Sequence, residues 1–127
     1  MMKERIKGMQ HIGLPTNDMK TTIAFYESLG FEIATRHINN GEDVVFLTLG
    51  NICIETYENG KAVGYDGAID HICLDVDDIE KTWEEAKAMG LNIIDSEINY
   101  LAFWANGVRF FNVLGHNKEK VEFGQIL

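Results

Sequence analysis

An α+β fold of two tandem βαβββ modules is predicted by an internal repeat, by two short amphipathic helices and by a series of glycine turns. The repeat is the strongest of these observations. Residues 9–34 align without a gap with residues 69–94, and seven positions are identical. The identical pairs are His11/His71, Ile12/Ile72, Leu14/Leu74, Asp18/Asp78, Thr22/Thr82, Gly30/Gly90 and Ile33/Ile93. We therefore expect both halves to contain the same elements in the same order.

The helix of each repeat is marked at both ends. Asp18 and Asp78 lie where an N-cap is needed. Gly30 and Gly90 follow about three turns later, where a left-handed residue ends a helix. In between, apolar residues recur every three or four positions, which is typical of a helix with one buried face. These stripes are Met19, Ile23, Tyr26 and Leu29 in the first repeat and Ile79, Trp83, Ala86 and Met89 in the second.

Strands are expected on both sides of each helix. One short strand precedes the helix, and hairpin turns separate the three strands that follow it. The turn signals are Asn40-Gly41, Gly50-Asn51, Asn106-Gly107 and Gly115-His116-Asn117. They place one module at residues 8–57 and the other at 68–127, within a single domain of residues 1–127. The polar, glycine-rich segment 59–67 joins the modules.

Each predicted sheet has one apolar face that its helix can cover. Two such sheets placed side by side can curl into a half-open barrel, with the helices outside and a cavity inside. Because the edges of these sheets need to be covered, we expect a homodimer.

Charge and composition exclude several partners. The 127 residues include 11 Lys and Arg against 20 Asp and Glu, a net charge of −9. Phosphate contacts need clustered cations, so we expect no nucleic-acid partner and no binding to anionic membranes. No apolar stretch approaches the ~20 residues of a membrane span, and residues 1–8 lack the apolar core of a secretion signal. Since two cysteines make no disulfide framework, we expect a cytoplasmic protein.

Two histidines and two glutamates occupy matching positions in the modules. His11 and His71 lie in the first strands, and Glu55 and Glu122 lie in the last ones. Strand side chains alternate between faces, so the apolar neighbours of each glutamate face the helix while the His and Glu side chains face the cavity. Buried carboxylates need a cation, and mixed nitrogen and oxygen ligation suits Zn, Ni, Co, Mn or Fe(II). The pattern predicts one divalent metal ion bound by these four side chains, with water completing an octahedron.

The other histidines and the cysteines are weaker candidates. His37 has no counterpart in the repeat and His116 lies in a hairpin loop, so both are expected on the surface. Cys53 and Cys73 are expected to line the cavity as small residues, with thiol ligation as a lesser alternative.

An apolar run with no helical period extends from Tyr100 to Trp104. One interpretation is a loop that covers part of the core. The other is an apolar wall for a substrate or a dimer contact, which makes Trp104 a candidate substrate-binding residue.

These motifs carry a family resemblance. The openings QHIGLPTNDM and DHICLDVDDI, the segment CIET and the closing EKVEF resemble the vicinal oxygen chelate superfamily over nearly the whole chain. Glyoxalase I (lactoylglutathione lyase) is the member that they resemble most, and the glyoxalase–bleomycin resistance proteins share the fold. The resemblance implies metal ligands at His11, Glu55, His71 and Glu122, with Ni or Co as the metal. It also implies a substrate contact at Asn59.

The resemblance implies an activity as well. Glyoxalase I converts the hemithioacetal of a 2-oxoaldehyde and a thiol into a 2-hydroxyacyl thioester through an enediolate. By this resemblance, Glu122 moves the proton between neighbouring carbon atoms, and Glu55 is the opposed carboxylate. The expected partner is a small molecule, either a thiol adduct or an acyl thioester.

Departures from glyoxalase I leave the substrate open. Pro15 stands where glyoxalase I has a glutathione-binding arginine, and the only cations between residues 91 and 119 are Arg109 and Lys118. One alternative is an enzyme resembling methylmalonyl-CoA epimerase, although an acidic chain has few cations to hold CoA phosphates. A dioxygenase needs only two His and one carboxylate, so the fourth candidate ligand, Glu55, argues against that activity. A non-enzymatic drug-binding protein, resembling the bleomycin-resistance proteins, needs no metal ligands, so the four candidate ligands argue against it as well.

Overall fold

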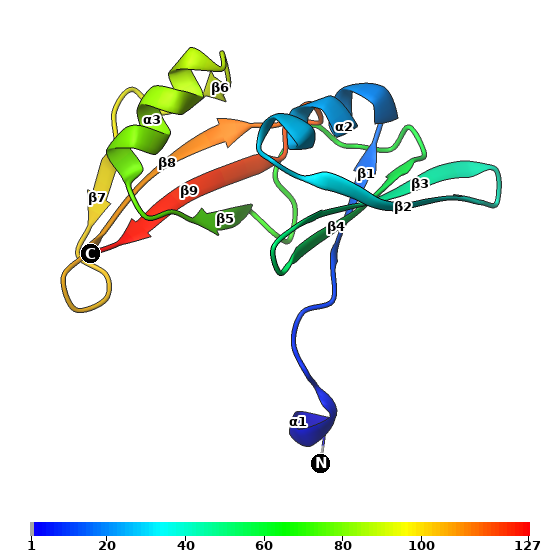
Figure 1. Cartoon of the computed structure of the whole chain (residues 1–127), viewed down its shortest axis with the longest axis horizontal. Coiled ribbons are helices and arrows are strands. Elements are labelled where there is room, and N and C mark those ends of the chain that lie inside the picture. Colours follow the sequence, from blue (N-terminus) through cyan, green and yellow to red (C-terminus); the bar gives the residue numbers. More distant parts are fainter. Residues whose placement is uncertain (1) are drawn as a thin grey trace. The chain divides into compact units, whose positions relative to one another are not determined.

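A computed structural model of the chain describes residues 2–127, with side chains from Lys3 onward. The chain divides between Ala62 and Val63 into two compact units. Each unit contains a mixed sheet and a ten-residue helix packed on it, which confirms the predicted α+β class (Figure 1). Within the described residues, no helix has both the length and the apolar character needed to cross a membrane.

The first unit contains one four-stranded sheet. Its elements are α1 (Met2–Arg5), β1 (Ile12–Thr16), α2 (Met19–Ser28), β2 (Glu32–Asn39), β3 (Glu42–Leu49) and β4 (Ile52–Glu58). The strand order is β1-β4-β3-β2, in which β1 is parallel to β4 and the other pairs are antiparallel. The chain therefore crosses from β1 over α2 to the far edge of the sheet and returns by hairpins.

Local signals fix α2 as predicted. The Asp18 side chain accepts a hydrogen bond from the Thr21 backbone N–H at 3.3 Å, which caps the helix. The helix ends at Ser28 with Leu29 as its C-cap, and Gly30 follows with φ of 100°, a value that favours glycine. One face of α2 is buried against the sheet. The residues of this core are Met19, Ile23, Tyr26, Phe31, Val45, Leu47 and Ile54.

The second unit repeats this topology. Its elements are β5 (His71–Asp75), α3 (Ile79–Ala88), β6 (Asn92–Ile93), β7 (Asn99–Leu101), β8 (Val108–Leu114) and β9 (Lys120–Ile126). The strand order is β5-β9-β8-β6, and β7 also pairs with β8, at residues 108–110, whereas β6 pairs with residues 113–114. Asp78 caps α3 and Gly90 follows it with φ of 70°, as predicted. Trp83 is half-buried and packs edge-on against the buried Phe111, with 5.0 Å between the ring centroids.

The second strand of this unit differs from the prediction. The sequence predicted one strand between the helix and the Asn106-Gly107 turn, whereas the structure has two short ones, β6 and β7. Between them the Asp95 side chain accepts a hydrogen bond from the Asn112 backbone N–H at 2.6 Å. A carboxylate thus takes the place of a strand carbonyl, and the pairing with β8 is interrupted there.

Candidate metal centre

The first unit brings His11 and Glu55 together. In the parallel pair β1–β4, Glu55 lies opposite Gly13, and His11 directly precedes β1. The His11 Nε2 atom is 3.7 Å from Glu55 Oε2, and the two side chains are 32% and 28% exposed. Phe46, the neighbour of Glu55 across β3–β4, packs edge-on against the imidazole with 5.8 Å between ring centroids. An apolar ring therefore holds the histidine beside the carboxylate.

The second unit builds the same pair. His71 is the first residue of β5, and Glu122 lies in β9 opposite Cys73. The His71 Nε2 atom is 3.7 Å from Glu122 Oε2. The distance equals that in the first unit, so both copies of the repeat hold imidazole and carboxylate in the same relation.

The faces of the strands are as the alternation predicted. Ile54 and Thr56, on either side of Glu55, are fully buried at 1% and 0% exposure. Val121 and Phe123 are buried on either side of Glu122. Each glutamate therefore projects from the face of its sheet opposite to the packed core.

This donor set fits a divalent metal ion. Two ligand atoms that are each about 2.1 Å from one ion lie at most about 4.2 Å apart. Atoms 3.7 Å apart, as in each pair, satisfy that limit. No group of three or more His, Cys, Asp and Glu that could hold a metal occurs among residues 2–127, so each pair amounts to half of the predicted ligand set.

The other ring nitrogen of each histidine is held by the residue before it. His11 Nδ1 is 2.9 Å from Gln10 Oε1, and His71 Nδ1 is 2.7 Å from Asp70 Oδ1. The hydrogen bond to His71 and a second one from Lys120 lower the pKa of Asp70 to about 2. Asp70 is thus an ionised acceptor, and His71 Nδ1 donates to it.

Cys73 is a protonated thiol at neutral pH in the metal-free protein. Partial desolvation and the neighbouring Glu122 carboxylate raise the pKa of this thiol to about 12, so it stays protonated. Gly124 lies beside it, and a Cβ atom there would be 2.9 Å from Cys73 Sγ. Because Gly124 has no side chain, the Cys73 thiol has room to lie next to Glu122.

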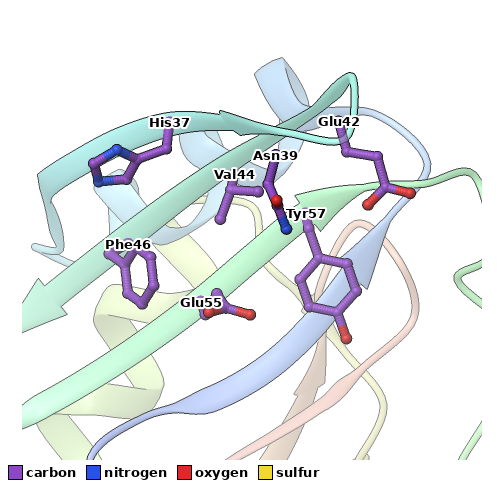
Figure 2. Close-up of a pocket in the computed structure, with 7 residues that line it drawn as sticks. All are labelled: His37, Asn39, Glu42, Val44, Phe46, Glu55 and Tyr57. Atoms are coloured by element: carbon purple, nitrogen blue, oxygen red, sulfur yellow. The ribbon is translucent and has the colours of Figure 1, made fainter.

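A cavity of 440 Å³ opens on the same face of the first sheet as Glu55 (Figure 2). Its walls come from alternate residues of β2, β3 and β4, which point to one side. The lining residues are His37, Asn39, Glu42, Val44, Phe46, Glu55 and Tyr57. Asn39 and Glu42 lie at the β2–β3 hairpin end of the cavity, and Phe46 lies opposite Glu55 in the cross-strand register.

His37 lines the cavity, which its position in the sequence did not predict. It is exposed, as predicted, but it lies in β2 opposite Val44 and so lines the cavity. Its Nε2 atom is 2.8 Å from Thr35 Oγ1. The alternation of His37 and Asn39 with Arg36 and Ile38 is the sequence signal that could have identified it.

The two predicted substrate-binding residues lie in loops. Asn59 follows β4, where its Oδ1 accepts a hydrogen bond from the Lys61 backbone N–H at 3.0 Å, and it is not among the cavity-lining residues. Trp104 lies between β7 and β8 with φ of 63° and is 71% exposed. Both assignments stay predictions. His116 is exposed in the β8–β9 loop, as expected.

Comparison with known proteins identifies the family. Residues 8–116 match the sequence model of the Glyoxalase/Bleomycin resistance protein/Dioxygenase superfamily. The chain belongs to this superfamily. The resemblance to the vicinal oxygen chelate proteins is thereby confirmed, and members of this superfamily commonly bind a divalent metal ion.

Individual relatives extend over nearly the whole chain. The uncharacterized protein YwbC of Bacillus subtilis is 31% identical over 134 residues, covering 94% of this chain and 98% of YwbC. A glyoxalase family protein from Enterococcus faecalis has a TM-score of 0.80 at 17% identity, covering 94% and 98% of the two chains. The fosfomycin resistance protein FosX from Listeria monocytogenes, complexed with Mn(II) and sulfate, has a TM-score of 0.75 at 17% identity, covering 96% and 94%. At these identities the solved structures show a shared fold.

Proposed function

We propose that this protein is a metal-dependent lyase of the glyoxalase I type. It would convert the hemithioacetal of a 2-oxoaldehyde and a thiol into a 2-hydroxyacyl thioester. The observation that carries this proposal is the His–Glu pair found in both units at the same 3.7 Å separation. Two such pairs supply four ligands. An octahedral ion then has two positions left, the number that two adjacent substrate oxygens need.

Each side chain has a role in this proposal. His11, Glu55, His71 and Glu122 would hold one divalent ion, Ni or Co in preference to Zn, Mn or Fe, with the two pairs supplied by one chain or by two. When bound, the ion supplies Lewis-acid stabilisation of the negative charge that develops on the substrate oxygens. Glu122 accepts the proton from one carbon atom and returns it to the adjacent one, while Glu55 is the opposed carboxylate.

The cavity chemistry favours a thiol without extra negative charge. Glu42 and Glu55 line the cavity, and its lining residues include no Lys or Arg. Arg36 is next to His37 in β2 but is paired with Asp43 at 2.6 Å. The carboxylates of an anionic thiol such as glutathione would meet like charges here, whereas Val44, Phe46 and Tyr57 offer apolar contact. A neutral or cationic thiol is therefore the better partner.

The test is metal analysis of the purified protein, followed by assays with methylglyoxal and a set of thiols. Cysteamine is the cationic thiol, 2-mercaptoethanol the neutral one, and glutathione and N-acetylcysteine the anionic ones. We expect bound metal, metal-dependent turnover and the highest kcat/KM with the neutral or cationic thiol. A metal-free protein with no turnover on any of them would contradict the proposal and favour a drug-binding protein.

We also propose a homodimer. β2 is one of the two edge strands of the first sheet, and all eight of its residues are exposed. An uncovered edge of this length is a surface that native proteins protect, often by association. Sedimentation at micromolar concentration should give about twice the chain mass of 14.4 kDa. A single species with the mass of one chain would exclude this assembly.

A further inference from the structure

The residue before each metal-site histidine has an orienting contact that the strand geometry alone does not provide. Gln10 and Asp70 both precede the strands β1 and β5, so the alternation of strand faces does not set the direction of their side chains. Here Gln10 Oε1 is 2.9 Å from the Nδ1 atom of His11, and Asp70 Oδ1 is 2.7 Å from the Nδ1 atom of His71. In both units the Nε2 atom then faces the glutamate.

Asp70 is the better-anchored member of this pair. The Lys120 ammonium donates to Asp70 Oδ1 at 3.1 Å and to Asp66 Oδ2 at 3.0 Å. Lys120 lies opposite His71 in the β5–β9 register, so the lysine and the imidazole approach Asp70 from neighbouring strands. One carboxylate oxygen thus accepts from both partners. Gln10 offers His11 a neutral amide oxygen, which is a weaker acceptor than a carboxylate.

We propose that Asp70 is a positioning residue that keeps His71 in the Nδ1–H tautomer, so that an unprotonated Nε2 faces Glu122 as a metal ligand. Gln10 has the same role for His11, with less effect because its acceptor is neutral. A carboxylate behind a ligating imidazole fixes the ring and raises its basicity as a ligand. This inference rests on the proposed function, because it needs metal at the His–Glu pairs.

The decisive variant is Asp70→Asn. Asparagine has nearly the same shape, but its amide can turn to donate to Nδ1, which selects the opposite tautomer and blocks Nε2 with a proton. We expect the Ni²⁺ affinity, measured by competition with a chromophoric chelator, to fall about 10- to 100-fold. Asp66→Asn is the matched control. It removes the other carboxylate on Lys120 without touching the ring, and its affinity should stay within about twofold of the parent.

A reciprocal substitution tests the proposed difference between the units. Gln10→Glu gives His11 the kind of partner that His71 has, and we expect it to strengthen Ni²⁺ binding several-fold. An unchanged or weaker affinity would contradict the claim that the carboxylate is the better orienting group.

The tautomer can be measured without metal. Imidazole ¹⁵N chemical shifts of the metal-free protein should identify His71 as Nδ1–H in the parent and as Nε2–H in Asp70→Asn. This readout does not respond to a merely structural role of Asp70. A parent protein with the Nε2–H tautomer would refute the inference even if the variant failed to fold.

The outcomes separate this inference from the function on which it rests. If the parent binds no metal, the proposed function and this inference both fail. If the parent binds Ni²⁺ and Asp70→Asn binds it equally well with an unchanged tautomer, the metal site stands and the positioning role of Asp70 is refuted.

Discussion

Glu122→Gln is expected to lower turnover by about 10²- to 10⁴-fold, the usual contribution of a general acid–base group. Glutamine keeps the length of the side chain and a carbonyl oxygen that can still be a ligand, but its amide cannot accept a proton from carbon. The Glu122 side chain is 17% exposed and projects away from the core, so packing should change little. Turnover must be measured per bound metal ion, so that lost metal is not counted as lost catalysis.

Glu55→Gln is the matched control, because Glu55 has the same place in the other unit and the same 3.7 Å distance to its histidine. We expect this variant to keep the larger share of the activity. If Glu122→Gln instead keeps more turnover than Glu55→Gln, Glu55 is the proton-transfer residue and Glu122 the opposed carboxylate. Parental turnover in both would rule out proton transfer by either residue.

The surroundings of the two glutamates support their different roles. Glu55 opens onto the 440 Å³ cavity and is 28% exposed. Glu122 is less exposed and lies next to Cys73 and opposite Asn112 in the strand register. In the proposed function this difference favours Glu122, the less hydrated carboxylate, as the proton acceptor.

Most of the fold of each unit could be predicted because it depends on signals that act within a few residues. The aspartate caps and the glycines after the helices decide where α2 and α3 begin and end. Strand alternation then decides which side chains are buried. The split into β6 and β7 could not be predicted, because it depends on a contact between Asp95 and Asn112, 17 residues apart.

The His–Glu pairs could be predicted for a different reason. The same His and Glu recur at matching positions of both repeats, which indicates a shared role, whereas a single strand histidine has no second copy for comparison. His37 has no copy, and its place in the cavity follows only from the β2–β3 register. The contacts of Gln10 and Asp70 could not be predicted, because both residues precede the strands β1 and β5, where strand alternation does not set the direction of a side chain.

Metal binding should depend on both units, and His71→Ala tests this with the largest expected loss. An ion that binds only the folded protein stabilises it, by about 2.7 kcal/mol at a concentration of 100 times Kd. The parent should therefore melt at a higher temperature in Ni²⁺. His71→Ala removes one of four proposed ligands and should lose most of that increase. The His71 side chain is 39% exposed at the start of β5, so the metal-free melting temperature should change little.

His116→Ala is the control for this prediction, because it removes another imidazole of the same unit from an exposed loop. It should keep the full response of the melting temperature to Ni²⁺, whereas His11→Ala should lose the response as His71→Ala does. A response that depends on His71 but not on His11 would mean that the first unit supplies no imidazole ligand. A response unchanged in both variants would remove the histidines from the site, and with them the reason for a metal-dependent activity.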